Sequence, residues 1–132
     1  MGDLAPRKAK PDQDVPDLPT IDLEAISNLR ELNPGDNGEF LREIVSIYIE
    51  DTPKRLAELK SCLASGDATT FTRAAHTIKG SSANVGAQLL KATAERLEAI
   101  SRRDGLGGVS GLIAECDAEF ERVKAELRRI AG

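Results

Sequence analysis

Apolar residues recur every three or four positions along most of the chain, with charged residues between them. This spacing is typical of amphipathic helices, because one helical turn takes 3.6 residues. No stretch shows the alternation expected of a strand, and no internal repeat is visible. The pattern predicts a short helix that begins after Thr20 or Asp22. Four longer helices are predicted over residues of about 39–65, 68–85, 87–103 and 110–130.

Turn-forming residues separate these helices. Residues 33–38 read Asn-Pro-Gly-Asp-Asn-Gly, Gly86 is a C-terminal stop, and residues 104–108 form a glycine-rich link. Short links between long amphipathic helices favour antiparallel neighbours. The predicted fold is therefore all-α, an up-down antiparallel four-helix bundle with a short additional N-terminal helix. Pro53 falls inside the second predicted helix and predicts a kink or a restart there.

The chain divides into a tail and one domain. Residues 1–18 are rich in Pro, Lys and Asp without periodicity, which predicts a disordered N-terminal tail. Residues 19–132 are predicted to form the helical domain, which is long enough to bury one core. Because the bundle closes on itself, we expect a monomer.

Charge and composition narrow the class of partners. The formal net charge of −4 gives a nucleic acid little electrostatic attraction. No apolar run approaches the roughly 18 residues of a membrane span. Cys62 and Cys116 both fall at apolar helix positions, which indicates reduced core residues. We therefore expect a cytoplasmic protein without a nucleic-acid or membrane partner.

The only histidine is the strongest candidate for chemistry. With Ile78 at the centre of the third helix's apolar face, His76 lies about 160° away and faces solvent. Gly80 stands one turn later and leaves room above the ring, because helical side chains lean toward the N-terminus. Lys79 is placed to neutralise an anion attached to the histidine. An exposed neutral imidazole has a ring nitrogen free to attack an electrophile.

Other kinds of site do not fit these residues. The order Lys79-Gly80-Ser81 is the reverse of a P-loop and lacks the upstream glycine. A di-metal bundle needs Glu-x-x-His pairs, and Arg73 stands three residues before the histidine. Ser81 and Ser82 are interpreted as hydroxyls that bond back to the preceding turn rather than as nucleophiles.

The segment His76-x-x-Lys79-Gly80-Ser81-Ser82-x-x-x-Gly86-Ala87 resembles the signature of histidine-containing phosphotransfer (HPt) domains of two-component phosphorelays. The similarity extends to the Phe40-Leu41-x-x-Ile44 start of the long helix and to the final Phe120-x-x-Val123-Lys124-x-x-Leu127 helix. It spans roughly residues 20 to 130.

This resemblance implies a phosphoryl carrier rather than an enzyme with kinase activity of its own. His76 would accept a phosphoryl group from a receiver-domain aspartyl phosphate and relay it to another receiver, in a reversible step. Lys79 would stabilise the added charge and Gly80 would give close access. No cofactor is expected, because the Mg²⁺ belongs to the receiver. The implied partners are response-regulator receiver domains, with a hybrid histidine kinase upstream.

The resemblance also places the docking surface and the neighbours of the site. A receiver would contact the first three helices over His76, through positions in which apolar and small residues predominate: Ile26, Leu29, Phe40, Ile44, Arg73 and Ala83. Gln88 and Glu98 are expected near the site, but some family members carry a glutamine where this chain has Glu98. Because an acidic residue there would repel a phosphate, no role is assigned to it.

An alternative stays open from the residues alone. The chain would then be a helical-bundle adaptor that binds receiver-like partners without carrying phosphate. The two hypotheses differ at His76, since only a carrier needs its imidazole.

Overall fold

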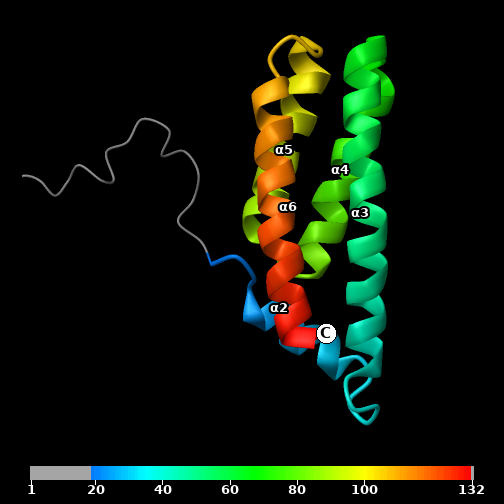
Figure 1. Cartoon of the computed structure of the whole chain (residues 1–132), viewed down its shortest axis with the longest axis vertical. Helices are drawn as coiled ribbons and strands as arrows, with labels where there is room; N and C mark the ends of the chain where they lie inside the picture. Colours follow the sequence, from blue (N-terminus) through cyan, green and yellow to red (C-terminus); the bar gives the residue numbers. More distant parts are fainter. Residues whose placement is uncertain (1–18, 132) are drawn as a thin grey trace, which may run out of the picture.

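The computed structural model describes residues 19–131, and the predicted tail of residues 1–18 lies outside them. The described residues form five helices, and the longer four stand side by side while the shortest lies across one end (Figure 1). Around the bundle each long helix packs on two others, in the order α3, α4, α5, α6 and back to α3. The predicted all-α antiparallel bundle with an additional N-terminal helix is confirmed. The helices are α2 (Leu23–Glu31), α3 (Glu39–Ser65), α4 (Ala68–Asn84), α5 (Gln88–Asp104) and α6 (Ser110–Ala131).

One apolar core fills the space between the four long helices. Its largest fully buried side chains include Phe71, Ile78, Leu90 and Leu97. Both cysteines are free and buried, as predicted, and burial raises the pKa of each thiol. The helix faces in the structure match the sequence pattern because burial of these apolar side chains fixes how each helix is rotated.

A kink or a restart was predicted at Pro53, and the restart is wrong, because α3 runs without interruption from Glu39 to Ser65. Proline removes one backbone donor, but its side chain is exposed here, so water can reach the carbonyl left without a partner. On either side of it Tyr48, Leu56 and Leu59 are buried in the core. Packing of both halves against the same core holds them in one helix.

The turn at Gly86 ties α2 to the rest of the bundle. Gly86 has a left-handed backbone (φ +77°), and its carbonyl accepts a 2.8 Å bond from the Asp22 backbone N–H. A Cβ added to Gly86 would lie 2.7 Å from the Asp22 carbonyl oxygen, so only glycine fits here. The predicted C-terminal stop of α4 is thereby also the place where α2 docks.

Candidate functional site

His76 lies on the outward face of α4. The helix begins at the N-cap Asp67, whose carboxylate accepts a 3.1 Å bond from the Thr70 N–H, and it ends before Gly86. Burial of Phe71, Ala75 and Ile78 sets the rotation of the helix. The His76 side chain is in consequence 64% exposed, as the sequence pattern predicts.

A buried carboxylate on α5 is the centre of the site. The Glu98 side chain is only 6% exposed, yet it receives three bonds from groups that reach over it. Nδ1 of His76 lies 2.8 Å from Oε2 and the Lys79 ammonium lies 2.8 Å from Oε1. The Arg102 guanidinium, one turn further along α5, donates to Oε2 at 2.9 Å. The carboxylate thus joins residues of two helices into one polar cluster.

These donors keep Glu98 ionised. Burial by itself would raise the pKa of the carboxyl group, because desolvation disfavours the charged form. Hydrogen bonds from Lys79, His76 and Arg102 outweigh burial and lower the pKa to about 2. At neutral pH the site therefore contains a carboxylate that can only accept hydrogen bonds.

The bond to Glu98 determines which nitrogen of His76 is reactive. Because an ionised carboxylate only accepts, Nδ1 must carry the proton in the neutral ring. The lone pair is then on Nε2, the outer nitrogen, for which the structure records no hydrogen bond with a residue of 19–131. The geometry presents a nucleophilic nitrogen to solvent and holds the other edge of the ring in place.

The negative charge of Glu98 does not prevent an anionic group from being attached to the His76 imidazole. Lys79 and Arg102 both contact the carboxylate, so the three charged groups sum to one positive charge. The carboxylate also lies on the Nδ1 side, away from the outer nitrogen. The repulsion expected from an acid at this position is therefore offset by its own neighbours.

Arg102 is the site residue that the sequence reasoning missed. The sequence does contain a signal for Arg102, which is its spacing from Glu98. Residues four apart on a helix share a face, and an arginine four residues after an acidic residue commonly pairs with that acid. Gln88, which was expected near the site, is the first residue of α5. Its side chain instead donates a 3.3 Å bond to the Pro19 carbonyl. Glu98 is the residue that contacts His76.

Gly80 leaves open space beside the histidine. It lies on the exposed face of α4, and a Cβ added to it would meet no atom within 4 Å. No packing contact therefore requires glycine at this position. The space around Gly80 is open, and the role of this glycine in giving access to the imidazole stays a prediction.

The six predicted docking residues differ in accessibility. Arg73 and Ala83 are exposed on α4, whereas Leu29, Phe40 and Ile44 are half-buried. Ile26 is only 1% exposed and packs in the core, so the prediction that it contacts a partner is corrected. Ile44 lines a small cavity between α3 and α4 beside Ile47, which is 57% exposed.

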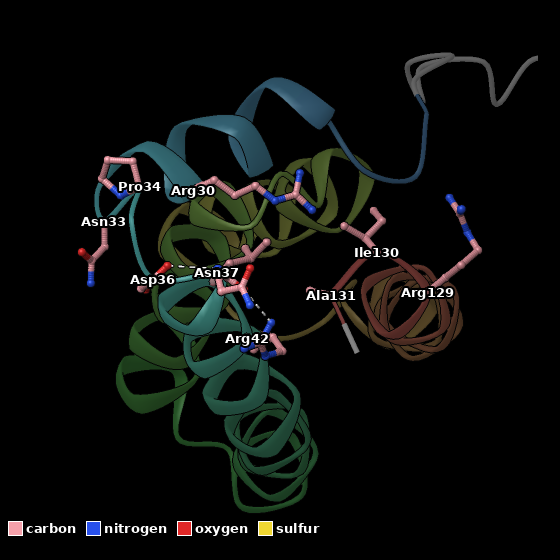
Figure 2. A pocket seen from close by; sticks show the side chains of 11 residues that line it. Arg30, Asn33, Pro34, Asp36, Asn37, Arg42, Arg129, Ile130 and Ala131 are labelled. Carbon is pink, nitrogen blue, oxygen red and sulfur yellow. Dashed lines mark hydrogen bonds between the residues drawn. The ribbon is translucent and has the colours of Figure 1, made fainter.

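Two of the larger cavities lie in different parts of the bundle. A groove of about 540 Å³ adjoins His76 between α4 and α5. A cavity of about 570 Å³ lies at the end of the bundle, between the α2–α3 turn and the last turn of α6 (Figure 2). There the Asp36 carboxylate already accepts the N–H groups of Gly38 and Phe40 at the start of α3. That helix terminus is occupied by an acid of the chain itself, so the groove at His76 is the relevant one.

Two absences hold for residues 19–131. No helix in this range is long and apolar enough to cross a membrane. No group of three or more His, Cys, Asp or Glu side chains in it is arranged to hold a metal ion.

Known proteins are similar to this chain in sequence. Residues 43–130 match the Hpt domain family. Over 98 residues the chain is 30% identical to Multistep phosphorelay regulator 1 of Schizosaccharomyces pombe, covering 72% of this chain and 33% of that protein. It is 22% identical over 108 residues to Histidine-containing phosphotransfer protein 2 of Arabidopsis thaliana, covering 80% and 69%. The chain thus spans a third of the first relative and about two thirds of the second.

Solved structures show the same bundle. The crystal structure of histidine-containing phosphotransfer protein B from Pseudomonas aeruginosa superposes with a TM-score of 0.78 at 29% identity, covering 86% of this chain and 95% of that one. The HPT domain of a sensor hybrid histidine kinase from Shewanella gives a TM-score of 0.66 at 18% identity, covering 84% and 92%, which is a likeness of fold. The family match spans well over half of the chain, and with it this protein belongs to the Hpt domain family.

Proposed function

We propose that this protein carries a phosphoryl group on Nε2 of His76 between the receiver domains of a phosphorelay. The observation that supports this most directly is the 2.8 Å bond between Nδ1 and the Glu98 carboxylate. It fixes the proton on the inner nitrogen and leaves the lone pair on the exposed one. By name, one of the relatives given above is a phosphorelay regulator and the other a histidine-containing phosphotransfer protein, which supports the same role.

The transfer step follows from this geometry. The Nε2 lone pair attacks the phosphorus of a receiver's aspartyl phosphate, the N–P bond forms, and the bond to the aspartyl oxygen breaks. The aspartate leaves as a carboxylate, and the ring becomes a phosphorylated imidazolium that retains its Nδ1 proton. Glu98 then faces a cation, and this charge pair stabilises the product. In the reverse direction the N–P bond breaks as the phosphoryl group returns to an aspartate, and the His76 ring becomes neutral again.

The carrier has only part of the catalytic task. Phosphoryl transfer depends mainly on positioning and charge stabilisation. We propose that this chain supplies the nucleophile and the docking surface around it, and that the receiver supplies Mg²⁺ and the acidic pocket. The proposed contacts are Phe40 and Ile44 on α3 with Arg73 and Ala83 on α4. No cofactor of its own is needed for such a step.

The test is phosphotransfer from a panel of receiver domains labelled on aspartate. We expect the wild-type chain to take up acid-labile, base-stable label, and His76→Gln to take up none while binding the receivers equally. Thr77→Gln is a matched control, since Thr77 is the next residue on the same helix and is also exposed. Binding to a receiver without any label would contradict the proposal and favour an adaptor.

A further inference from the structure

The cavity of about 570 Å³ at the end of the bundle is bordered by arginines from three helices. Arg30 belongs to α2, Arg42 to α3 and Arg129 to α6, and all three side chains are exposed. Arg30 extends from α2 toward the last turn of α6, where Ile130 lies (Figure 2). One opening is thus surrounded by guanidinium groups that the fold brings together from distant parts of the sequence.

These guanidinium groups keep donors to spare. Arg42 donates one bond to the Asn37 carbonyl, and Arg129 pairs with Glu126 of its own helix. For Arg30 the structure records no ion pair with another residue of 19–131. Because a guanidinium has five N–H donors, each of the three can bind a further carboxylate.

The carboxylate of Asp36 does not neutralise the cavity. It is the one acid among the described residues that line the opening, and its two oxygens accept the N–H groups of Gly38 and Phe40. Three guanidinium groups therefore face a single carboxylate that the backbone already uses. The cavity attracts acidic groups.

The sequence contains such groups directly before the described residues. Residues 11–18, which we call the acidic segment, read Pro-Asp-Gln-Asp-Val-Pro-Asp-Leu. Asp12, Asp14 and Asp17 give it three negative charges, and it contains no lysine or arginine. Its charge is thus complementary to that of the cavity.

The acidic segment joins the structure at the end of the bundle where the cavity lies. Pro19, the next residue, accepts a 3.3 Å bond from the side chain of Gln88, the first residue of α5. Both figures place the beginning of the described chain beside the last turns of α6 (Figures 1 and 2). Eight extended residues span about 26 Å, whereas the nine residues of α2 span about 14 Å. The acids can therefore reach Arg30.

We propose that the acidic segment docks in this cavity, with its carboxylates between Arg30 of α2 and Arg129 of α6. Ion pairs at a surface are weak between separate molecules, but the attachment at Pro19 gives the acids a high local concentration. Because the docked segment contacts both helices, it holds α2 against the end of the bundle. The proposal does not depend on a phosphoryl group on His76.

The test places a nitroxide label in the tail of the full chain. The label is attached through Gln13→Cys, which leaves all three acids in place. Cys62 and Cys116 are buried, and burial raises the pKa of both thiols, so the label reacts with the introduced thiol. Wild-type protein treated in the same way checks this selectivity. Amide signals close to the nitroxide are broadened in ¹⁵N NMR spectra.

We expect strong broadening of the Arg30 and Ile130 amides at low salt. It should fall by at least about half in 0.5 M NaCl, where the Debye length is about 4 Å. Replacement of the three acids of the segment by Asn should have the same effect, and so should Arg30→Gln combined with Arg129→Gln. In these variants hydrogen exchange of the α2 amides should become about two- to five-fold faster.

Two matched controls change charge elsewhere. Replacement of Arg7, Lys8 and Lys10 by Gln alters as many charges in the tail but leaves the acidic segment intact, so the broadening should remain. Arg103→Gln removes an exposed arginine that pairs with Asp104 at the other end of the bundle. It should leave both the broadening and the exchange rates unchanged.

Two outcomes would overturn the proposal. Broadening at the cavity that is equal in the wild type, in the Asn variant and at high salt would show that the tail is near only because it is tethered. A mixture of labelled chains without ¹⁵N and unlabelled chains with ¹⁵N tests for a second copy as the occupant. Equal broadening in this mixture would assign the cavity to the acidic segment of another molecule.

Discussion

Nδ1 of His76 and Oε2 of Glu98 lie 2.8 Å apart, although 22 residues separate them in the chain. One partner is mostly exposed and the other almost wholly buried. A buried acid thus controls the chemistry of a surface imidazole. Because Glu98 accepts three donors at once, this pair cannot be altered without affecting Lys79 and Arg102.

Removal of the acid should disturb the tautomer of His76. In the wild type we expect the Nδ1–H form to predominate in ¹⁵N NMR spectra of the neutral ring. In Glu98→Ala both tautomers should be populated, and phosphotransfer should slow by about 10- to 100-fold. Glu98→Gln keeps an oxygen that accepts the Nδ1 proton but lacks the charge, so its tautomer should resemble the wild type. An unchanged tautomer in Glu98→Ala would refute this assignment.

The depressed pKa of Glu98 should appear in the acid stability of the protein. Its folded pKa of about 2 is below the ordinary value of 4.5, so the folded state binds the proton less tightly than the unfolded state. The resulting stabilisation is complete above about pH 4.5 and is lost as the pH falls toward 2. Urea unfolding from pH 2 to 6 measures it. Glu98→Gln should show a weaker dependence over this range, and an identical profile would contradict the expectation.

Glu119 should make the stability of the protein depend on pH in the opposite direction from Glu98. Its side chain is buried on α6, Oε1 has no hydrogen-bond partner, and burial raises the pKa of the carboxyl group despite a bond from Thr93. Because the folded state binds the proton more tightly, stability is highest below the ordinary pKa and falls as the pH rises through the raised one. Glu119→Met should therefore stabilise the protein at pH 7 by about 1 kcal/mol in chemical denaturation. A loss of stability at that pH would show that the carboxylate is better solvated than its burial indicates.

Gly80 and Gly86 should respond differently to a methyl group. Gly80 is helical with open space around it, so Gly80→Ala should raise the free energy of unfolding by about 0.5–1 kcal/mol. Gly80→Leu adds a side chain that leans over the imidazole, and it should slow phosphotransfer at unchanged fold. Circular dichroism and transfer rates distinguish the two effects. Equal transfer rates in all three proteins would rule out a need for clearance.

Gly86→Ala should instead destabilise the protein by about 2 kcal/mol, because it combines left-handed strain with a clash against the Asp22 backbone. Gly66→Ala is the matched control. Its φ of +78° is nearly the same, but a Cβ there meets nothing within 4 Å. Its cost should be only about 1 kcal/mol. Hydrogen exchange of the α2 amides should accelerate in Gly86→Ala alone.

The bundle could be predicted from the sequence because each helix carries its own apolar stripe. The spacing that places Ile78 inward places His76 outward, and this single relation located the site. Helix ends at Gly66, Gly86 and Gly105 were also predictable, because glycine is favoured where a helix ends on a positive φ, and all three have one. These features are local, so a single sequence contains them.

The contact between Glu98 and His76, unlike the position of His76 itself, depends on which helix faces which. Glu98 contacts His76 only because α4 and α5 pack side by side in a particular register, and no spacing within one helix reveals that. Its burial beneath two cations and the His76 ring turned an apparent obstacle to phosphate binding into an ion-paired support. The burial of Ile26, which was predicted to contact a partner, could not be foreseen for the same reason, because it depends on the way α2 crosses the end of the bundle. Pro53 shows the reverse case, in which tertiary packing overrides a local signal.

All the charged groups that contact one another around His76 belong to α4 and α5, which are joined through the turn at Val85–Ala87. The reactive centre is thus one helical hairpin, assembled from contacts between two consecutive helices. Such contacts close quickly during folding, because only short loops must be formed. We expect the hairpin to be structured early, and α2 to join it late. Changes at Phe40 and Ile44 on α3 can then alter the contacts with a partner while the reactive hairpin stays intact.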